Sequence, residues 1–176
     1  MNRPVLGTIS ILALLGGGLY LASTYKDKPA DPVRTNYEAA AARSAIQSWL
    51  ELPLPGSASN VHCMVENLER TKLVYACFDL PTVEMVSLFD RQTRFPMWTE
   101  MVADPALLQA MQALSDGQKP WWQIGQVADT VCAQKAGKRN VAPAALKWRT
   151  QVCAIPISET TKRVFIAFSE EPVEEK

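Results

Sequence analysis

The sequence predicts an α+β protein, with a small antiparallel sheet of about five strands packed with about three helices, two disulfides and one preceding N-terminal transmembrane helix. Three observations support this expectation. The chain opens with an uncharged, largely apolar run. Segments with helical spacing of apolar residues then alternate with short segments rich in β-branched and aromatic residues. All four cysteines follow the apolar run.

The apolar run extends from Pro4 to Thr24, directly after Arg3. At about 1.5 Å of rise per residue, such a helix is long enough to cross roughly 30 Å of hydrocarbon. A cleaved signal peptide usually has a shorter apolar core and a small-x-small cleavage site, which residues 21–24 match only loosely. We therefore expect residues 1–24 to be a retained membrane anchor, with a signal sequence as the alternative.

The cysteines, rather than the flanking charges, predict on which side of the membrane the C-terminal domain lies. Arg3 precedes the apolar run, whereas Lys26, Lys28 and Arg34 follow it, so the flanking charges leave the orientation ambiguous. An even number of cysteines outside the membrane segment is typical of disulfides, which persist in oxidising compartments. We expect a single-pass protein of the bacterial inner membrane with its C-terminal domain in the periplasm, or a periplasmic protein if the segment is cleaved.

Residues 25–35 carry prolines and mixed charge, so they are expected to be a linker, followed by a periplasmic α+β domain over residues 36–169. Thr35 and Glu38 have the spacing of a capping box, which predicts that a helix begins here and ends before Pro53.

The clearest predicted hairpin pairs residues 60–67 with residues 72–79. If Asn67 lies opposite Leu73, Cys63 falls opposite Cys77. Directly opposed residues have Cβ atoms about 4.5 to 5.5 Å apart, so we expect a disulfide between these two cysteines. A third strand is predicted over residues 82–90.

Two helices are predicted in the middle of the chain. The first has Asp104 as its N-cap, Pro105 at its first position and Gly117 directly after its end. The second is predicted from Pro120 to Gly137, so that Cys132 would lie near its C-terminal end. The stretch that starts at Lys135 is basic and typical of a loop, with Lys135, Lys138 and Arg139.

The chain is predicted to finish with two strands, over residues 146–157 and 162–169. In the first of these, Trp148, Thr150 and Val152 alternate with Lys147, Arg149 and Gln151, as in a strand with one solvated face. Cys153 would join this strand to Cys132 in a second disulfide. Residues 170–176 are expected to be an acidic disordered tail.

No catalytic, cofactor-binding or metal-binding residue is predicted. His62 is the single histidine, and its neighbour Cys63 would point to the opposite face of a strand, so the two do not form a catalytic pair. The four cysteines lack the close spacing of a structural zinc site. The 18 basic and 18 acidic residues become a net charge of −1 when Arg3 is set aside with the leader, which gives no reason to expect nucleic-acid binding.

The tryptophans are the candidate partner-binding residues. Trp121 and Trp122 are neighbours about 100° apart on a predicted helix, and Trp98 lies in a predicted loop. We expect a non-catalytic, single-span accessory subunit of a bacterial envelope complex of the secretion, conjugation or pilus type. Its partners would be other envelope proteins, and residues 4–24 would bind the membrane. The alternatives are a cell-wall-acting enzyme, such as a peptidoglycan hydrolase, and a cleaved periplasmic binding or inhibitor protein.

Overall fold

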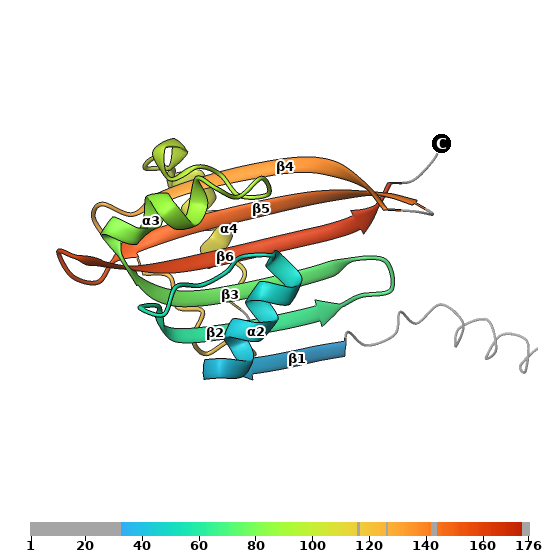
Figure 1. Cartoon of the computed structure of the whole chain (residues 1–176), viewed down its shortest axis with the longest axis horizontal. Helices are drawn as coiled ribbons and strands as arrows, with labels where there is room; N and C mark the ends of the chain where they lie inside the picture. Colours follow the sequence, from blue (N-terminus) through green and yellow to red (C-terminus); the bar gives the residue numbers. More distant parts are fainter. Residues whose placement is uncertain (1–32, 116, 126, 142–143, 174–176) are drawn as a thin grey trace, which may run out of the picture. The chain divides into compact units, whose positions relative to one another are not determined.

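In the residues that the computed structural model describes, 33–115, 117–125, 127–141 and 144–173, six antiparallel strands form one sheet in the order β1-β2-β3-β6-β5-β4 (Figure 1). The strands are β1 (Val33–Glu38), β2 (Ser59–Asn67), β3 (Lys72–Pro81), β4 (Val131–Val141), β5 (Ala144–Pro156) and β6 (Thr161–Pro172). The helices are α2 (Ala39–Leu50), α3 (Thr82–Phe89) and α4 (Pro105–Gln112), with one 3₁₀ turn, η1 (Trp98–Glu100). The edges of the sheet are therefore β1 and β4.

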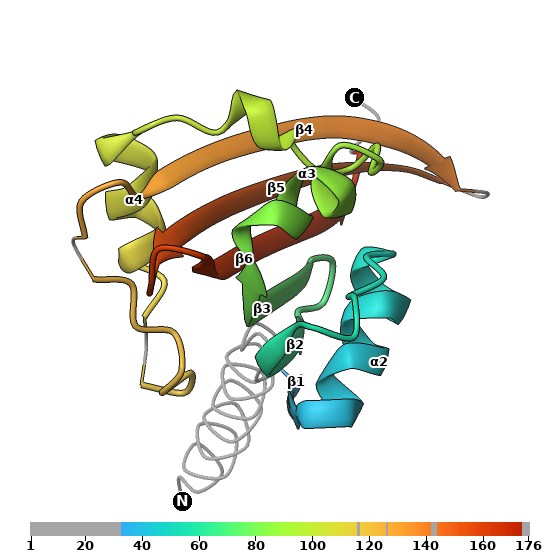
Figure 2. The same ribbon diagram turned by 60° about the vertical axis from the view of Figure 1, so that its left-hand side comes forward.

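Both faces of the sheet carry a hydrophobic core. The helices α2 and α3 lie on one face, which we call the α2 face, and α4 lies on the other, the α4 face (Figures 1 and 2). Successive strand residues alternate between the two cores: Ala76 belongs to the core of the α2 face and Cys77 to that of the α4 face. The α2 face is covered by buried residues of α2, α3 and their loops. On the α4 face, α4 and four apolar residues that follow it cover only part of the sheet; these are Leu114, Trp121, Trp122 and Ile124.

The chain runs directly from β1 into α2, and the predicted capping box is wrong. Thr35 lies in β1 opposite Val65, and Glu38 is the N-cap without a side-chain cap hydrogen bond. The buried residues of α2 recur at helical spacing and pack on the sheet; they are Ala42, Ala45, Ile46 and Leu50.

Residues 82–90 do not form the predicted third strand, because Thr82–Phe89 is the helix α3. Its β-branched residues favoured a strand. The residues that it buries, Met85, Leu88 and Phe89, are three and four positions apart, which is helical spacing. Packing against the core therefore outweighs the local strand propensity.

The predicted helix from Pro120 to Gly137 is also wrong. Residues 131–141 form β4 and pair with β5 along their whole length. Several of these residues have low strand propensity, so the pairing with β5 stabilises β4 more than its own sequence does. Gly137, which was expected to end a helix, lies opposite Trp148, and a Cβ atom at this position would be 2.7 Å from the indole. The glycine lets the indole lie across the strand.

The start of α4 is confirmed. The carboxylate of Asp104 accepts a hydrogen bond from the backbone N–H of Leu107 at 3.0 Å, and Pro105 is the first helical residue. The helix ends at Gln112, earlier than Gly117 had suggested.

The predicted Cys63–Cys77 disulfide is wrong, because the register of the hairpin differs by one residue. The Leu68 N–H donates to the Thr71 carbonyl at 2.8 Å and closes the turn, so Asn67 pairs with Lys72. Cys63 then lies opposite Ala76. A shift of one residue moves a side chain to the other face of a strand. Cys63 and Cys77 are consequently free thiols buried on opposite faces.

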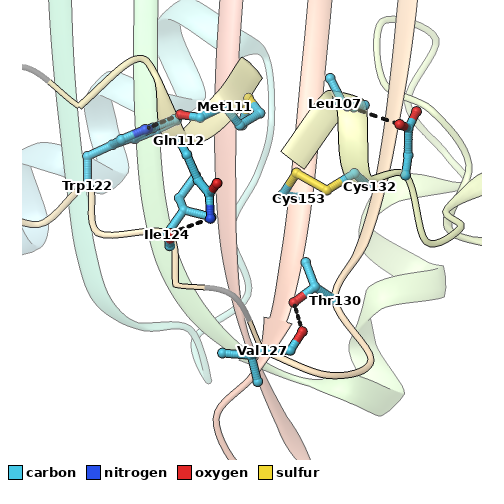
Figure 3. Close-up of a disulfide and its surroundings, with 10 residues drawn as sticks. Leu107, Met111, Gln112, Trp122, Ile124, Val127, Thr130, Cys132 and Cys153 are labelled. Carbon is cyan, nitrogen blue, oxygen red and sulfur yellow. Dashed lines mark hydrogen bonds between the residues drawn. A yellow bond between two sulfur atoms is a disulfide. The ribbon is translucent and has the colours of Figure 1, made fainter. Parts of the chain in front are cut away.

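A disulfide joins Cys132 to Cys153, which lie directly opposite each other on β4 and β5 with a Cα–Cα distance of 4.1 Å (Figure 3). Both half-cystines are buried on the α4 face, in the same core cluster as Leu107 and Met111 of α4. The bridge therefore links the edge strand β4 to the rest of the sheet. Cys132 lies on a strand and not at the end of a helix.

The predicted fold class is thus corrected: the described residues form a sheet of six strands rather than about five, with one disulfide rather than two. The anchor predicted within residues 1–24 and most of the linker lie outside the described residues. Within the described ranges, no helix is both long enough and apolar enough to span a bilayer. Strand β1 begins at Val33, inside the expected linker, and β6 continues to Pro172, inside the expected tail.

Candidate functional site

Three buried carboxylates of the sheet are each compensated by an arginine. The closest N–O distances are 2.6 Å for Asp79–Arg163, 2.9 Å for Glu66–Arg34 and 2.7 Å for Glu170–Arg139. A buried carboxylate is costly unless a charge and hydrogen bonds compensate it. These acids are therefore held as ion pairs within the fold.

The Asp79–Arg163 ion pair belongs to a polar cluster on the α4 face. Arg163 donates two hydrogen bonds to the carboxylate, at 2.6 and 2.9 Å, and Asn60 donates a third. Burial acts to raise the pKa of Asp79, but the hydrogen bonds from Arg163 and Asn60 outweigh it, so the pKa lies below its usual value. Asp79 is therefore ionised at neutral pH and fixes the guanidinium in place.

His62, Cys77 and Trp121 complete this cluster around a hollow of about 290 Å³. Cys77 lies directly opposite His62 on the neighbouring strand, and the Trp121 ring stacks on the imidazole with 5.5 Å between the ring centroids. A thiol beside an imidazole is the composition of a Cys-His nucleophile pair. The sequence did not suggest this pair, because the predicted register placed Cys63 opposite Cys77.

The electrostatics of the cluster oppose nucleophilic catalysis. Burial raises the pKa of the Cys77 thiol to about 12; the positive charge of Arg163 acts against this shift, and the negative charge of Asp79 adds to it. Burial likewise raises the pKa of Cys63 to about 12. A thiol attacks as its thiolate, so both cysteines are inert at neutral pH.

Cys77 is also too far from the disulfide to exchange with it. Phe165 of β6 lies between them, opposite Cys77 on one side and Cys153 on the other. Two strand spacings correspond to about 10 Å. The structure therefore keeps the free thiol and the bridge apart, and Cys77 is a buried packing residue.

The structure separates the three tryptophans that the sequence singled out. Trp122 is fully buried, and its indole N–H donates to the Met111 carbonyl at 2.9 Å (Figure 3). Trp121 is partly buried against His62. Trp98 packs against the core of the opposite α2 face. Only Trp121 and Trp122 lie together, with 5.9 Å between their ring centroids, and Trp122 serves the core rather than a surface.

The part of the α4 face not covered by α4 is polar and carries three exposed basic residues, Lys138, Lys147 and Arg149, which we call the basic patch. They line a hollow of about 520 Å³ over β4, β5 and β6. Lys138 lies directly opposite Lys147. Like charges directly opposite each other destabilise a sheet. Glu171 forms an ion pair with Lys147 at 3.0 Å, whereas among the described residues neither Lys138 nor Arg149 has an ion pair.

The outer edge of β4 adjoins the basic patch. At its start, the N–H and carbonyl of Cys132 bond to the carbonyl and N–H of Val102, at 2.8 and 3.1 Å. The short Cα–Cα distance of the disulfide agrees with this orientation, because pairs that do not exchange backbone hydrogen bonds are the closer ones in an antiparallel ladder. Since orientation alternates along a strand, the backbone groups of Gln134, Ala136, Lys138 and Asn140 also point away from β5. No other described strand pairs with them.

Sequence reasoning noted part of this surface. The sequence predicts a basic loop from Lys135 to Arg139 and a solvated side of residues 146–157 that carries Lys147 and Arg149. The sequence did not reveal that pairing of β4 with β5 brings Lys138 next to Lys147 and Arg149 on one face of the sheet. Comparison of the chain with known protein families, with characterised proteins and with solved structures finds no match.

Proposed function

We propose that this protein is a non-catalytic accessory subunit of a bacterial envelope complex, which binds another envelope protein through the basic patch and the adjoining edge of β4. The observation that carries the proposal is the basic patch itself. Two of its cations, Lys138 and Arg149, are exposed without an ion-pair partner in the described part of the chain, although the buried carboxylates Asp79, Glu66 and Glu170 are each compensated. Electrostatic complementarity of such a surface to an acidic partner favours association and orientation.

The disulfide supports the proposed compartment. Structural disulfides are stable in the periplasm and rare in the reducing cytoplasm, so the Cys132–Cys153 bridge favours a domain on the oxidising side of the membrane. Attachment to the inner membrane through residues 4–24 belongs to the same proposal and rests on the apolar sequence of that segment.

The chemistry of the polar cluster supports a binding role rather than catalysis. Burial keeps both free thiols protonated, and the negative charge of Asp79 is compensated by the positive charge of Arg163. Removing a proton from a thiol with a pKa of about 12 at neutral pH is unfavourable by about five orders of magnitude.

Site-specific photo-crosslinking in the native envelope tests the proposal. One variant carries a photoreactive residue in place of Ala136, which is exposed on the α4 face; the matched control carries it in place of Val83, which is 86% exposed on α3. We expect one defined crosslinked partner from position 136 and none from position 83. Identical patterns at the two positions, or no crosslink at either, would contradict the proposal.

A further inference from the structure

We propose that the outer edge of β4 binds an extended, acidic segment of the partner protein, which joins the sheet as a further antiparallel or parallel strand. This inference rests on the proposed function and specifies how the partner is bound. It names one occupant, a partner segment whose backbone pairs with β4 and whose acidic side chains face the lysines of that strand.

The backbone of β4 has outward N–H and carbonyl groups that can pair with an added strand. From Gln134 to Asn140, every second residue points its N–H and carbonyl away from β5, over a length of about 20 Å. An incoming strand of about seven residues fits this length. Main-chain hydrogen bonds supply affinity in strand addition, and the alternating side chains supply specificity.

The charges of β4 select an acidic strand. Lys138 lies on the α4 face and Lys135 on the α2 face, and neither has an ion pair among the described residues. Arg139 also lies on the α2 face, next to Lys138 in sequence, and is shared between Glu170 and Glu51. An acidic residue on either side of an added strand therefore meets a cation of β4. Each such contact is solvated, so the lysines contribute to selection and association rate more than to affinity.

The same lysines oppose pairing between two copies of this protein. Lysines on an edge strand are a common protection against edge-to-edge association. Two β4 edges brought together would place Lys135 and Lys138 of one copy beside the cations of the other. Specificity of this kind combines attraction to one partner with repulsion of the alternatives.

The opposite edge of the sheet lacks these features. Strand β1 has six residues, against eleven in β4. Its charged side chains, Arg34 and Glu38, have opposite signs, and Arg34 is paired with Glu66. The geometry and the charge therefore both favour β4.

Binding of a defined peptide to the full-length protein tests the proposal. The probe is a capped seven-residue peptide of alternating valine and glutamate, and the control peptide has lysine in place of each glutamate. Affinity is followed by fluorescence anisotropy, and amide hydrogen exchange is followed at residue resolution. We expect the acidic peptide to bind and to slow exchange at Gln134, Ala136 and Lys138 at least tenfold, because their outward N–H groups become hydrogen-bonded. The lysine peptide should leave these rates unchanged.

Two variants separate the backbone contribution from the charge contribution. Ala136→Pro removes an outward N–H without removing a hydrogen bond to β5, since proline is tolerated where the N–H of an edge strand faces solvent. The double variant K138E/K147E reverses two charges of the basic patch. We expect Ala136→Pro to weaken binding about tenfold or more, and the charge reversal to weaken it less and mainly by slowing association. Lys162→Glu, a single lysine-to-glutamate reversal on β6 outside the basic patch, should bind as the unmodified protein does, and a thermal melt of each variant identifies any that fail to fold.

The alternative outcomes overturn the proposal in different ways. Binding of poly-aspartate and the acidic peptide alike, without slower exchange along β4, would show ionic contact only. Slow exchange at Gln134 and Ala136 in the free protein at every concentration would show that the chain itself covers the edge. Slow exchange that appears only at high concentration would indicate pairing of two copies. If the peptide fails to bind while position 136 still crosslinks to a partner, strand addition is wrong and the proposed function stands; failure of both contradicts both.

Discussion

The Cys132–Cys153 bridge offers a stability prediction whose magnitude follows from its position in the chain. The two cysteines are 21 residues apart. In the chain-entropy model, closing a loop of this length destabilises the unfolded chain by about 3 kcal/mol at 25 °C. We therefore expect the double variant C132A/C153A to lose about this much in the free energy of unfolding, with a further loss from the two buried sulfur atoms that it removes.

A second double variant isolates the effect of the cross-link. C63A/C77A also removes two buried sulfur atoms but leaves the bridge intact. The assay is urea unfolding of the full-length protein followed by tryptophan fluorescence. A loss of 3 kcal/mol lowers the midpoint by roughly 1 to 3 M, because m-values of small proteins in urea are about 1 to 3 kcal/mol per molar. If C132A/C153A were no less stable than C63A/C77A, or if reductant left the midpoint of the unmodified protein unchanged, the bridge would not stabilise the fold.

Three further predictions concern Asp79, the two free thiols and Gly137. The lowered pKa of Asp79 makes its ionised form stabilising above about pH 4, and this contribution is lost as the pH falls through the lowered value; acid titration of D79N should therefore show a shallower loss of stability than that of the unmodified protein. Because burial raises the pKa values of Cys63 and Cys77, we expect the free energy of unfolding to decline as the pH rises from about 9 towards 12. We also expect iodoacetamide at pH 8 to label neither thiol until the protein unfolds, and rapid labelling of the folded protein would contradict their burial. Gly137→Ala brings a Cβ to 2.7 Å from an indole and should cost about 1 to 3 kcal/mol in thermal unfolding, whereas Gly56→Ala, with no atom within 4 Å, should cost far less.

The sequence predicted the elements whose local pattern agrees with their packing. The hairpin of β2 and β3 and the N-cap of α4 belong to this group. The register of the hairpin could not be predicted in this way, because it depends on where the turn closes. The backbone hydrogen bond from Leu68 to Thr71 sets the register, and Cys63 and Cys77 therefore lie on opposite faces of the sheet. A disulfide inferred from strand pairing is therefore only as reliable as the register.

The errors at α3 and β4 have opposite physical causes. In α3, β-branched residues suggested a strand although Met85, Leu88 and Phe89 had helical spacing for burial. In β4, no local pattern indicated a strand, and its residues are held in the sheet by pairing with β5. The basic patch could not be predicted for the same reason, since Lys138 and Lys147 become neighbours only through this pairing.

Residue-resolved amide exchange along β4, in the free protein and with the crosslinked partner bound, tests most directly whether this strand is an open edge used for binding. In the free protein we expect fast exchange at Gln134 and Ala136, alternating with slow exchange at Lys135 and Gly137, whose N–H groups face β5. The partner should remove this alternation by slowing Gln134 and Ala136. Uniform protection in the free protein, or an alternation that the bound partner leaves unchanged, would contradict the proposed role of β4.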